Sequence, residues 1–435
     1  MPHSAVKLAM VLALAGPALA QTPTAPQPPL TLTLQQALDR ARQYGPAYLA
    51  ANLSAQIAHE ESAQAKAALL PTASWLNQFI YTQPNGTPSG VFVSNDGPHV
   101  YNEQATVHGD IYAPGKRADY HRALAAEAVA RAKAEVAARG LAAVVVQDYY
   151  AMTVAQRKLA NARQALREAQ QLLDITQKLE QGGEAAHADA IKAEIQVEQR
   201  QRDLEDAQLA LDKARVAIAI LLFPDFRQDF ALADDLGAAV PLPDFPQVRE
   251  LAAKNNPDIR AAEATVQQQT YAIASARAAM LPALSFDYFF GINANQFALY
   301  NRDHLNNLGS VAQAQLTVPL WTWGAARSKV REARLGLEQA RNDLTFTQRQ
   351  LLAELQAFYG EARVSSGQVG SLRHSMELSA DSLRLTTERY TAGEATVLEV
   401  VDAQTTLWQA RNAYDDGLAR YRLALANLQT LTGTF

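Results

Sequence analysis

The chain has 435 residues, of which 48% are hydrophobic and 19% are charged, and this balance excludes wholesale disorder. Its 39 basic and 44 acidic residues give a formal net charge of −5, and no basic run is long enough to neutralise a nucleic-acid backbone. Cysteine is absent, which excludes disulfides, thiolate metal sites, cysteine nucleophiles and a lipidated N-terminal cysteine. We therefore expect a folded protein with no nucleic-acid partner.

Residues 1–20 have the pattern of a secretory signal peptide, with Lys7 followed by an apolar run and then by small residues before Gln21. Residues 21–30 are rich in proline and are expected to form an unstructured leader. No later run of eighteen apolar residues occurs, so we expect no transmembrane helix in the mature chain. A mature chain of this kind spans a membrane only as a β-barrel.

The segment 34–70 predicts a helix that ends at Pro71, because proline disfavours a helical conformation in the residue before it. Two extended segments follow, and a second pair ends with the sequence VAQAQLTVPLW at 311–321. Apolar and polar residues alternate there, as in a strand with one face in lipid and one face in water. The apolar residues expected to face lipid are Leu316, Val318 and Leu320.

Two segments, 115–182 and 324–392, are rich in Ala, Leu, Glu, Gln, Arg and Lys and contain no proline. Each predicts an unbroken helix, which at 1.5 Å per residue reaches roughly 100 Å. Each is followed by a tight turn, at Gly183 or Gly393, and by another helix. The shorter helices are expected to stack end to end beside the long one, giving a rod of paired helices.

The chain contains two copies of one unit. The sequence GPAYLAANLSAQIAHEESAQAKAALLP at 45–71 is similar to NPDIRAAEATVQQQTYAIASARAAMLP at 256–282, and the turn sequence Gly-Glu-Ala at 183–185 corresponds to the one at 393–395. The mature chain therefore divides into three parts. These are a first repeat at 31–222, an inter-repeat linker at 223–245 in the equatorial region, and a second repeat at 246–435.

No group of residues predicts catalysis, a cofactor or a metal. His187 and Asp189 are too few for a metal site, and there is no glycine-rich phosphate loop or nucleophile elbow. Glu399 and Asp402 lie three residues apart after Gly393, so they share one helical face. They are either ordinary exposed carboxylates favoured by the helix dipole, or residues that a closed trimer gathers in three copies on its axis.

The two repeats, the Leu-Pro before each strand pair and the sequence YTAGEATVLEVVDAQTTL at 390–407 resemble the TolC-type outer membrane efflux protein family, the outer membrane factors. The resemblance extends over residues 32–433. It implies a mixed α/β membrane protein that forms a homotrimer. Each protomer contributes four strands to a twelve-stranded transmembrane β-barrel in outer membrane lipid and four helical strands to a long antiparallel α-helical coiled-coil barrel. This periplasmic tunnel is closed at its tip.

The resemblance also implies a function and site residues. The trimer would conduct substrates passively from periplasm to exterior, docked on a periplasmic adaptor (membrane fusion) protein and an inner-membrane pump. Glu399 and Asp402 would form the periplasmic constriction, and Tyr390 and Asp189 would belong to a hydrogen-bonded tip latch. The chain has Ala395 where some relatives have a latch arginine. The sequence does not specify what replaces that arginine, which substrate is exported, or whether the pump is driven by protons or ATP.

Two other classes of protein share some of these features. A periplasmic coiled-coil adaptor or scaffold has long helices and a signal peptide, but it lacks amphipathic strand pairs in both halves. A secreted helical enzyme has only scattered carboxylates in its favour. We therefore expect a channel of the cell outer membrane with a periplasmic helical domain, and neither catalysis nor a cofactor.

Overall fold

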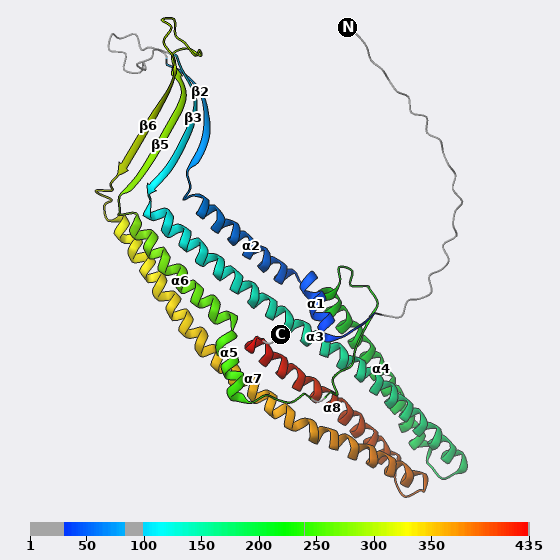
Figure 1. Cartoon of the computed structure of the whole chain (residues 1–435). Coiled ribbons are helices and arrows are strands. Elements are labelled where there is room, and N and C mark those ends of the chain that lie inside the picture. Colours follow the sequence, from blue (N-terminus) through cyan, green and yellow to red (C-terminus); the bar gives the residue numbers. More distant parts are fainter. Residues whose placement is uncertain (1–29, 83–98, 239, 434–435) are drawn as a thin grey trace, which may run out of the picture.

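The structure is a computed structural model, and it describes residues 30–82, 99–238 and 240–433. The expected signal peptide at 1–20 and nearly all of the 21–30 leader lie outside the described residues. Four strands form one end of the molecule, and long helices run from them to two turns at the opposite end (Figure 1).

Each half of the chain consists of two short helices, two strands, one long helix and a further helix. In the first half these are α1 Leu34–Tyr44, α2 Pro46–Ala67, β2 Thr72–Tyr81, β3 His99–Tyr112, α3 Pro114–Gly182 and α4 His187–Leu222. In the second half they are α5 Phe245–Asn255, α6 Pro257–Ala278, β5 Ala283–Ala294, β6 Leu308–Thr317, α7 Ala325–Thr391 and α8 Val397–Thr432. A short strand precedes each half, β1 Leu30–Leu32 and β4 Phe230–Leu232.

The long helices are unbroken, as the sequence predicts: α3 has 69 residues and α7 has 67. The first helix, however, is not continuous from residue 34 to residue 70. Gly45 has an extended conformation and Pro46 begins a new helix, because a proline cannot donate the hydrogen bond that would continue the first one. The same interruption occurs at Asn256 and Pro257 in the second half.

Helices and strands follow one lateral order. The antiparallel sheet has the order β2-β3-β5-β6, and next to it α2 packs on α3, α3 on α6, and α6 on α7. Toward the far end α4 takes the place of α2 beside α3, and α8 lies between α3 and α7 (Figure 1). Each strand therefore continues the layer of the helix that precedes or follows it.

The two faces of the sheet differ in chemistry. On one face the pairing places Ala312 opposite Tyr288 and Ala314 opposite Phe286. On the other face polar side chains bond across the strands, with Oγ of Ser74 2.6 Å from Oγ1 of Thr106. The alternation expected from the sequence is thus present in the sheet.

Strand β6 is shorter than the alternating sequence suggests. It ends at Thr317, so the expectation that Val318 and Leu320 belong to the strand is wrong, and Leu316 is its last residue but one. Pro319 has no N–H group for a ladder hydrogen bond, and the strand ends just before it. No described helix combines the length and apolar character needed to cross a membrane.

The 223–245 linker between the two halves of the chain also contributes to the core. Its strand β4 pairs in parallel with β1, with Leu32 opposite Leu232. Around this pair lies the largest core cluster, in which Tyr149 of α3 and Leu222 of α4 are fully buried. Burial raises the pKa of the Tyr149 phenol above its ordinary value, and its hydroxyl donates a 2.6 Å hydrogen bond to the carbonyl of Ala233.

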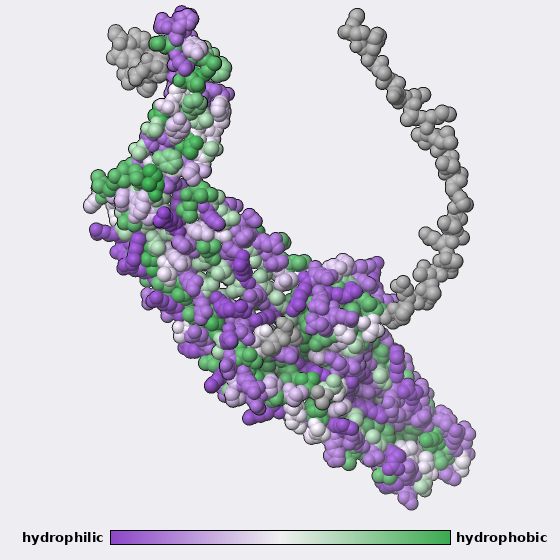
Figure 2. Space-filling view, in the orientation of Figure 1, coloured by the Kyte–Doolittle hydropathy of each residue, from purple (hydrophilic) through white to green (hydrophobic). Residues whose placement is uncertain are grey.

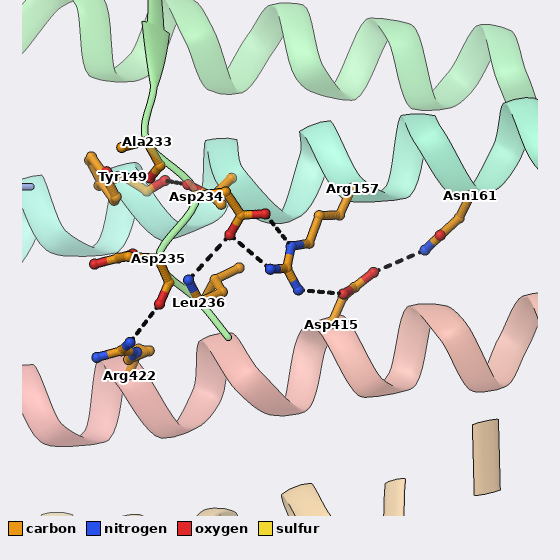
Figure 3. Close-up of polar contacts among 10 residues, drawn as sticks. Tyr149, Arg157, Asn161, Ala233, Asp234, Asp235, Leu236, Asp415 and Arg422 are labelled. Atoms are coloured by element: carbon orange, nitrogen blue, oxygen red, sulfur yellow. Dashed lines mark hydrogen bonds and ion pairs between the residues drawn. The ribbon is translucent and has the colours of Figure 1, made fainter. Parts of the chain in front are cut away.

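Figure 3 shows how residues 233–236 of the linker tie α3 to α8, a contact that we call the equatorial strap. Arg157 of α3 bonds to both oxygens of Asp234, at 2.6 and 2.8 Å, and to Asp415 of α8 at 3.0 Å. From α8, Arg422 donates to the carbonyl oxygens of Asp235 and Ala238. The guanidinium of Arg157 thus joins the first half, the linker and the second half.

Replacing Arg157 with Met is expected to lower the free energy of unfolding by about 2 kcal/mol, since Asp415 is left largely buried without its cation. The loss is smaller than for a fully buried pair because Asp234 is partly exposed. Thermal melting of the helical signal in detergent measures it. Lys158→Met is the matched control: Lys158 also joins α3 to α8, through the exposed Asp416 at 2.8 Å, and such a pair contributes about 0–1 kcal/mol. Equal melting points for the two variants would contradict the role of the strap.

Candidate functional site

The candidate site is the end of the molecule farthest from the strands, where α3 turns into α4 and α7 turns into α8 (Figure 1). Gly183 and Gly393 lie in these two turns with φ angles of 79° and 76°. This left-handed conformation is unfavourable for residues with a Cβ atom, which explains glycine at both positions.

A small apolar core joins the two turns. Its buried members are Leu172, Ala193, Tyr390, Val397 and Val400, which come from all four helices of this end. The turns of the two halves therefore pack against each other, although some 210 residues separate them along the chain.

Tyr390 is 5% exposed, and its hydroxyl lies 2.9 Å from Oγ1 of Thr176 in α3. The Thr176 hydroxyl proton is directed at the carbonyl of Leu172, 2.8 Å away, so the tyrosine is the donor in the bond between the two hydroxyls. This bond ties the end of α7 to α3. The sequence did not single out Thr176, because nothing in the pattern of a helix reveals a partner from the other half.

Asp189, in the first turn of α4, accepts a 3.1 Å hydrogen bond from Lys192. Among the described residues it has no hydrogen bond to Tyr390. The two residues instead line one cavity of about 670 Å³, whose wall also includes Lys192 and Gly393. The structure thus brings the two expected latch residues to the same cavity without bonding them to each other.

Glu399 caps the start of α8. Its carboxylate accepts hydrogen bonds from the backbone N–H and the hydroxyl of Thr396, both at 3.1 Å, while Oγ1 of Thr396 accepts from the Glu399 N–H. This reciprocal arrangement is a capping box that begins α8. The backbone hydrogen bond from Thr396, aided by its hydroxyl, lowers the pKa of Glu399 below its ordinary value. The sequence Thr396-Val-Leu-Glu399 carries the signature of such a box, so this role was readable in advance.

Asp402 follows one turn later on the same face of α8 and is exposed. Within the described residues it has neither a hydrogen bond nor an ion pair. Arg389, at the end of α7, lies 3.5 Å from Glu399 and donates a 3.0 Å hydrogen bond to the carbonyl of Glu394. A cation is therefore present in this turn although residue 395 is alanine.

No group of three or more metal-ligating side chains occurs among residues 30–82, 99–238 and 240–433. His187 lies 2.7 Å from Glu180 on the exposed side of the first turn. The polar groups around the two turns include carboxylates, a tyrosine hydroxyl and the cations Lys192 and Arg389. Such a set can attract cations and form exchangeable hydrogen bonds between helices.

The comparisons with known proteins agree with this architecture. The family model described as "Outer membrane efflux protein" matches residues 37–222 and 248–434. The proteases secretion protein PrtF of Dickeya chrysanthemi is 23% identical over 397 residues, which are 88% of this chain and 84% of that protein. The pyoverdine export outer membrane protein OpmQ of Pseudomonas putida is 28% identical over 65% of this chain, an alignment that spans 58% of its own length.

Solved structures show the same fold. The CmeC outer membrane channel of Campylobacter jejuni superposes with a TM-score of 0.79 at 17% identity, over 92% of this chain and 85% of that one. A membrane protein from Pseudomonas aeruginosa superposes with a TM-score of 0.82 at 20% identity, over 95% and 96% of the two chains. Since the family model covers most of both halves, the chain belongs to the outer membrane efflux protein family.

Proposed function

We propose that three copies of this chain form one duct through which substrates pass passively from the periplasm to the exterior. The observation that carries the proposal is the amphipathic sheet of four strands at the end of a helical layer. Within the described chain β2 and β6 are its edges, and each has one side without a strand partner. Four strands are too few to enclose an aqueous lumen, whereas three such sheets joined edge to edge make a closed barrel of twelve.

The helices would continue this ring. Because α2 and α7 lie at opposite sides of the helical layer, as β2 and β6 do in the sheet, the same rotation that joins the strands joins the helices into a tunnel. The two halves, 31–222 and 246–435, would be repeats of one unit with the 223–245 linker at the equator. Their shared element order supports this division.

The function as a channel is favoured over that of a periplasmic adaptor, because the relatives are outer membrane proteins of efflux and secretion systems. The family consists of channel proteins rather than enzymes. As the resemblance to the family implies, the duct would work with a periplasmic adaptor and an inner-membrane pump. These partners would select what is exported.

Within this duct, Glu399 and Asp402 would form a periplasmic constriction. Both are exposed in the protomer, and both lie at the start of α8 beside the turn. Three-fold symmetry would repeat the pair around the axis. Arg389 would supply the positive charge that some relatives place two residues after the glycine, since it already contacts Glu399.

The oligomeric state tests the proposal. We expect the detergent-solubilised protein to have three times the mass of the mature chain, measured by light scattering with the detergent contribution subtracted. A stable monomer that retains the helical and strand content would contradict it, because such a monomer leaves both sheet edges unpaired.

Tyr390 and Asp189 would act together as a latch of the closed tip, and weakening it is expected to raise the conductance in planar bilayers. Tyr390→Phe removes the hydroxyl that bonds Thr176, which costs about 1 kcal/mol, and Asp189→Ala removes a carboxylate from the same cavity. Ion selectivity should stay as in the wild type. The control is Tyr421→Phe, which removes a comparable 2.7 Å hydrogen bond to Val240 far from the turns. If the double variant and Tyr421→Phe have the same conductance, Tyr390 and Asp189 do not form the latch.

A further inference from the structure

The segment 318–324, between β6 and α7, exposes more large apolar surface than its surroundings. Leu320 and Trp323 are each 89% exposed and Trp321 is 74% exposed, with the two indole rings 5.7 Å apart in an edge-to-face arrangement. Figure 2 shows a hydrophobic patch over this segment, at the left edge of the view where the strands meet the helices, with hydrophilic surface on the helices below it. We call it the tryptophan loop.

Its backbone conformation is unusual. Trp323 has a φ angle of 52°, in the left-handed region that costs a residue with a Cβ atom about 1–2 kcal/mol. Gly324 follows with a φ of 82°. The chain thus holds a large aromatic side chain, strained and in water, at a position where glycine would be less strained. Neither the exposed side chain nor the strained backbone of Trp323 stabilises the isolated protomer. An apolar environment outside the protomer explains both.

Basic side chains follow directly. Arg327, Lys329 and Arg331 lie in the first two turns of α7 and are exposed, and none of them forms an ion pair among the described residues. The first turn contains no acidic residue, although the helix dipole disfavours cations at this end. Arg327 also lines a cavity of about 270 Å³ together with Trp321, Trp323 and Met280. A ligand with an anionic group next to an apolar group would pair with these basic side chains and cover the exposed tryptophans.

We propose that the tryptophan loop and the basic start of α7 bind the headgroup of an anionic phospholipid in the periplasmic leaflet of the outer membrane. The inference rests on the proposed function, which puts the sheet in the membrane and the helices in the periplasm. The loop then lies at the membrane surface, where indole rings are favoured. Arg327 and Lys329 contact the lipid phosphate, since juxtamembrane cations attract anionic headgroups.

Charge favours lipid over a neighbouring protomer as the occupant. In a closed ring β6 adjoins β2 of the next copy, and the stretch next to β2, residues 62–71, contains Lys66 and no acidic residue, whereas Glu60 and Glu61 lie farther from the sheet along α2. A neighbouring copy would therefore add positive charge beside Arg327 and Lys329. Free phosphate would satisfy the cations but would leave Leu320 and the two tryptophans in water.

The test uses the full-length protein in vesicles of phosphatidylcholine with a minor share of phosphatidylglycerol. Native mass spectrometry after extraction counts the lipids retained on each oligomer. The double variant Arg327→Gln with Lys329→Gln is expected to retain roughly tenfold less phosphatidylglycerol than the wild type. The number of chains in its oligomer should stay the same. The matched control, Arg341→Gln with Arg349→Gln, removes two exposed arginines farther along α7 and should retain the lipid.

A second variant, Trp323→Gly, keeps the left-handed backbone without strain. It should lose bound lipid without losing thermal stability, whereas a purely structural role for Trp323 predicts the opposite pattern. Unchanged retention of phosphatidylglycerol in the double variant would overturn the inference. Dissociation of the variants into monomers would also overturn it, by identifying the neighbouring copy as the occupant. A wild-type protein that is itself monomeric would contradict the proposed function rather than the lipid site.

Discussion

Ala312→Arg is expected to abolish assembly in the outer membrane, whereas Gln313→Arg, one residue further, is expected to be tolerated. Ala312 lies opposite Tyr288 on the apolar face near the middle of β6, and Gln313 lies opposite Asp287 on the polar face. An arginine facing lipid near the midplane costs about 2–4 kcal/mol in each protomer, and a trimer would carry three copies. The amount of trimer in outer-membrane fractions, resolved by gel migration without heating, measures the effect.

The structure moves this test away from Leu316, where the sequence alone would place it. Leu316 is next to the end of the strand, close to the helices, and the penalty for arginine falls to about 0–1 kcal/mol near a membrane surface. If Ala312→Arg assembles and Gln313→Arg does not, the two faces of the sheet have the opposite assignment.

Removing charge from Glu399 and Asp402 should have the second large effect. Glu399→Gln with Asp402→Asn is expected to lower the preference for cations in planar bilayers by roughly tenfold, the change that about 1.4 kcal/mol of lost attraction gives. Glutamine at 399 is preferable to alanine, because it can still complete the capping box with Thr396. Loss of selectivity then cannot be attributed to an unwound start of α8.

The control for the Glu399 and Asp402 variant is Glu377→Gln with Asp381→Asn. It changes two exposed carboxylates on α7 that lie several turns before Gly393. This variant should keep the selectivity of the wild type. The pH adds a further check. Because hydrogen bonds from Thr396 lower the pKa of Glu399, its carboxylate stays charged to a lower pH than an ordinary glutamate does. Cation selectivity of the single variant Asp402→Asn should therefore persist to a lower pH than an ordinary carboxylate would allow. If Glu399→Gln with Asp402→Asn is as cation-selective as its control, neither residue lies on the permeation path.

The regular parts of the fold were predictable because local patterns determine them. A proline-free run rich in helix-forming residues specifies α3 and α7, and the alternation of residues specifies the faces of β6. The Gly45-Pro46 break was also readable, since the proline stands in the sequence and its effect on the preceding residue is local.

What the sequence did not reveal depends on contacts between distant residues. The β1–β4 pair has three residues in each strand, too few for a periodic signal, and the strap joins Arg157 to Asp234 and Asp415 across most of the chain. At the tip, glycine and the capping box are local features, whereas the bond between Tyr390 and Thr176 is not. The left-handed conformation of Trp323 has no sequence signature at all.

The conductance of the purified wild-type protein in a planar lipid bilayer tests the central claim most directly. A trimeric duct with one narrow, acidic entrance predicts discrete current steps of small and uniform size, cation-selective, and blocked by multivalent cations from the periplasmic side. Protein that inserts fully into the bilayer but gives no current steps, or gives steps indifferent to the sign of the ion, would contradict the account.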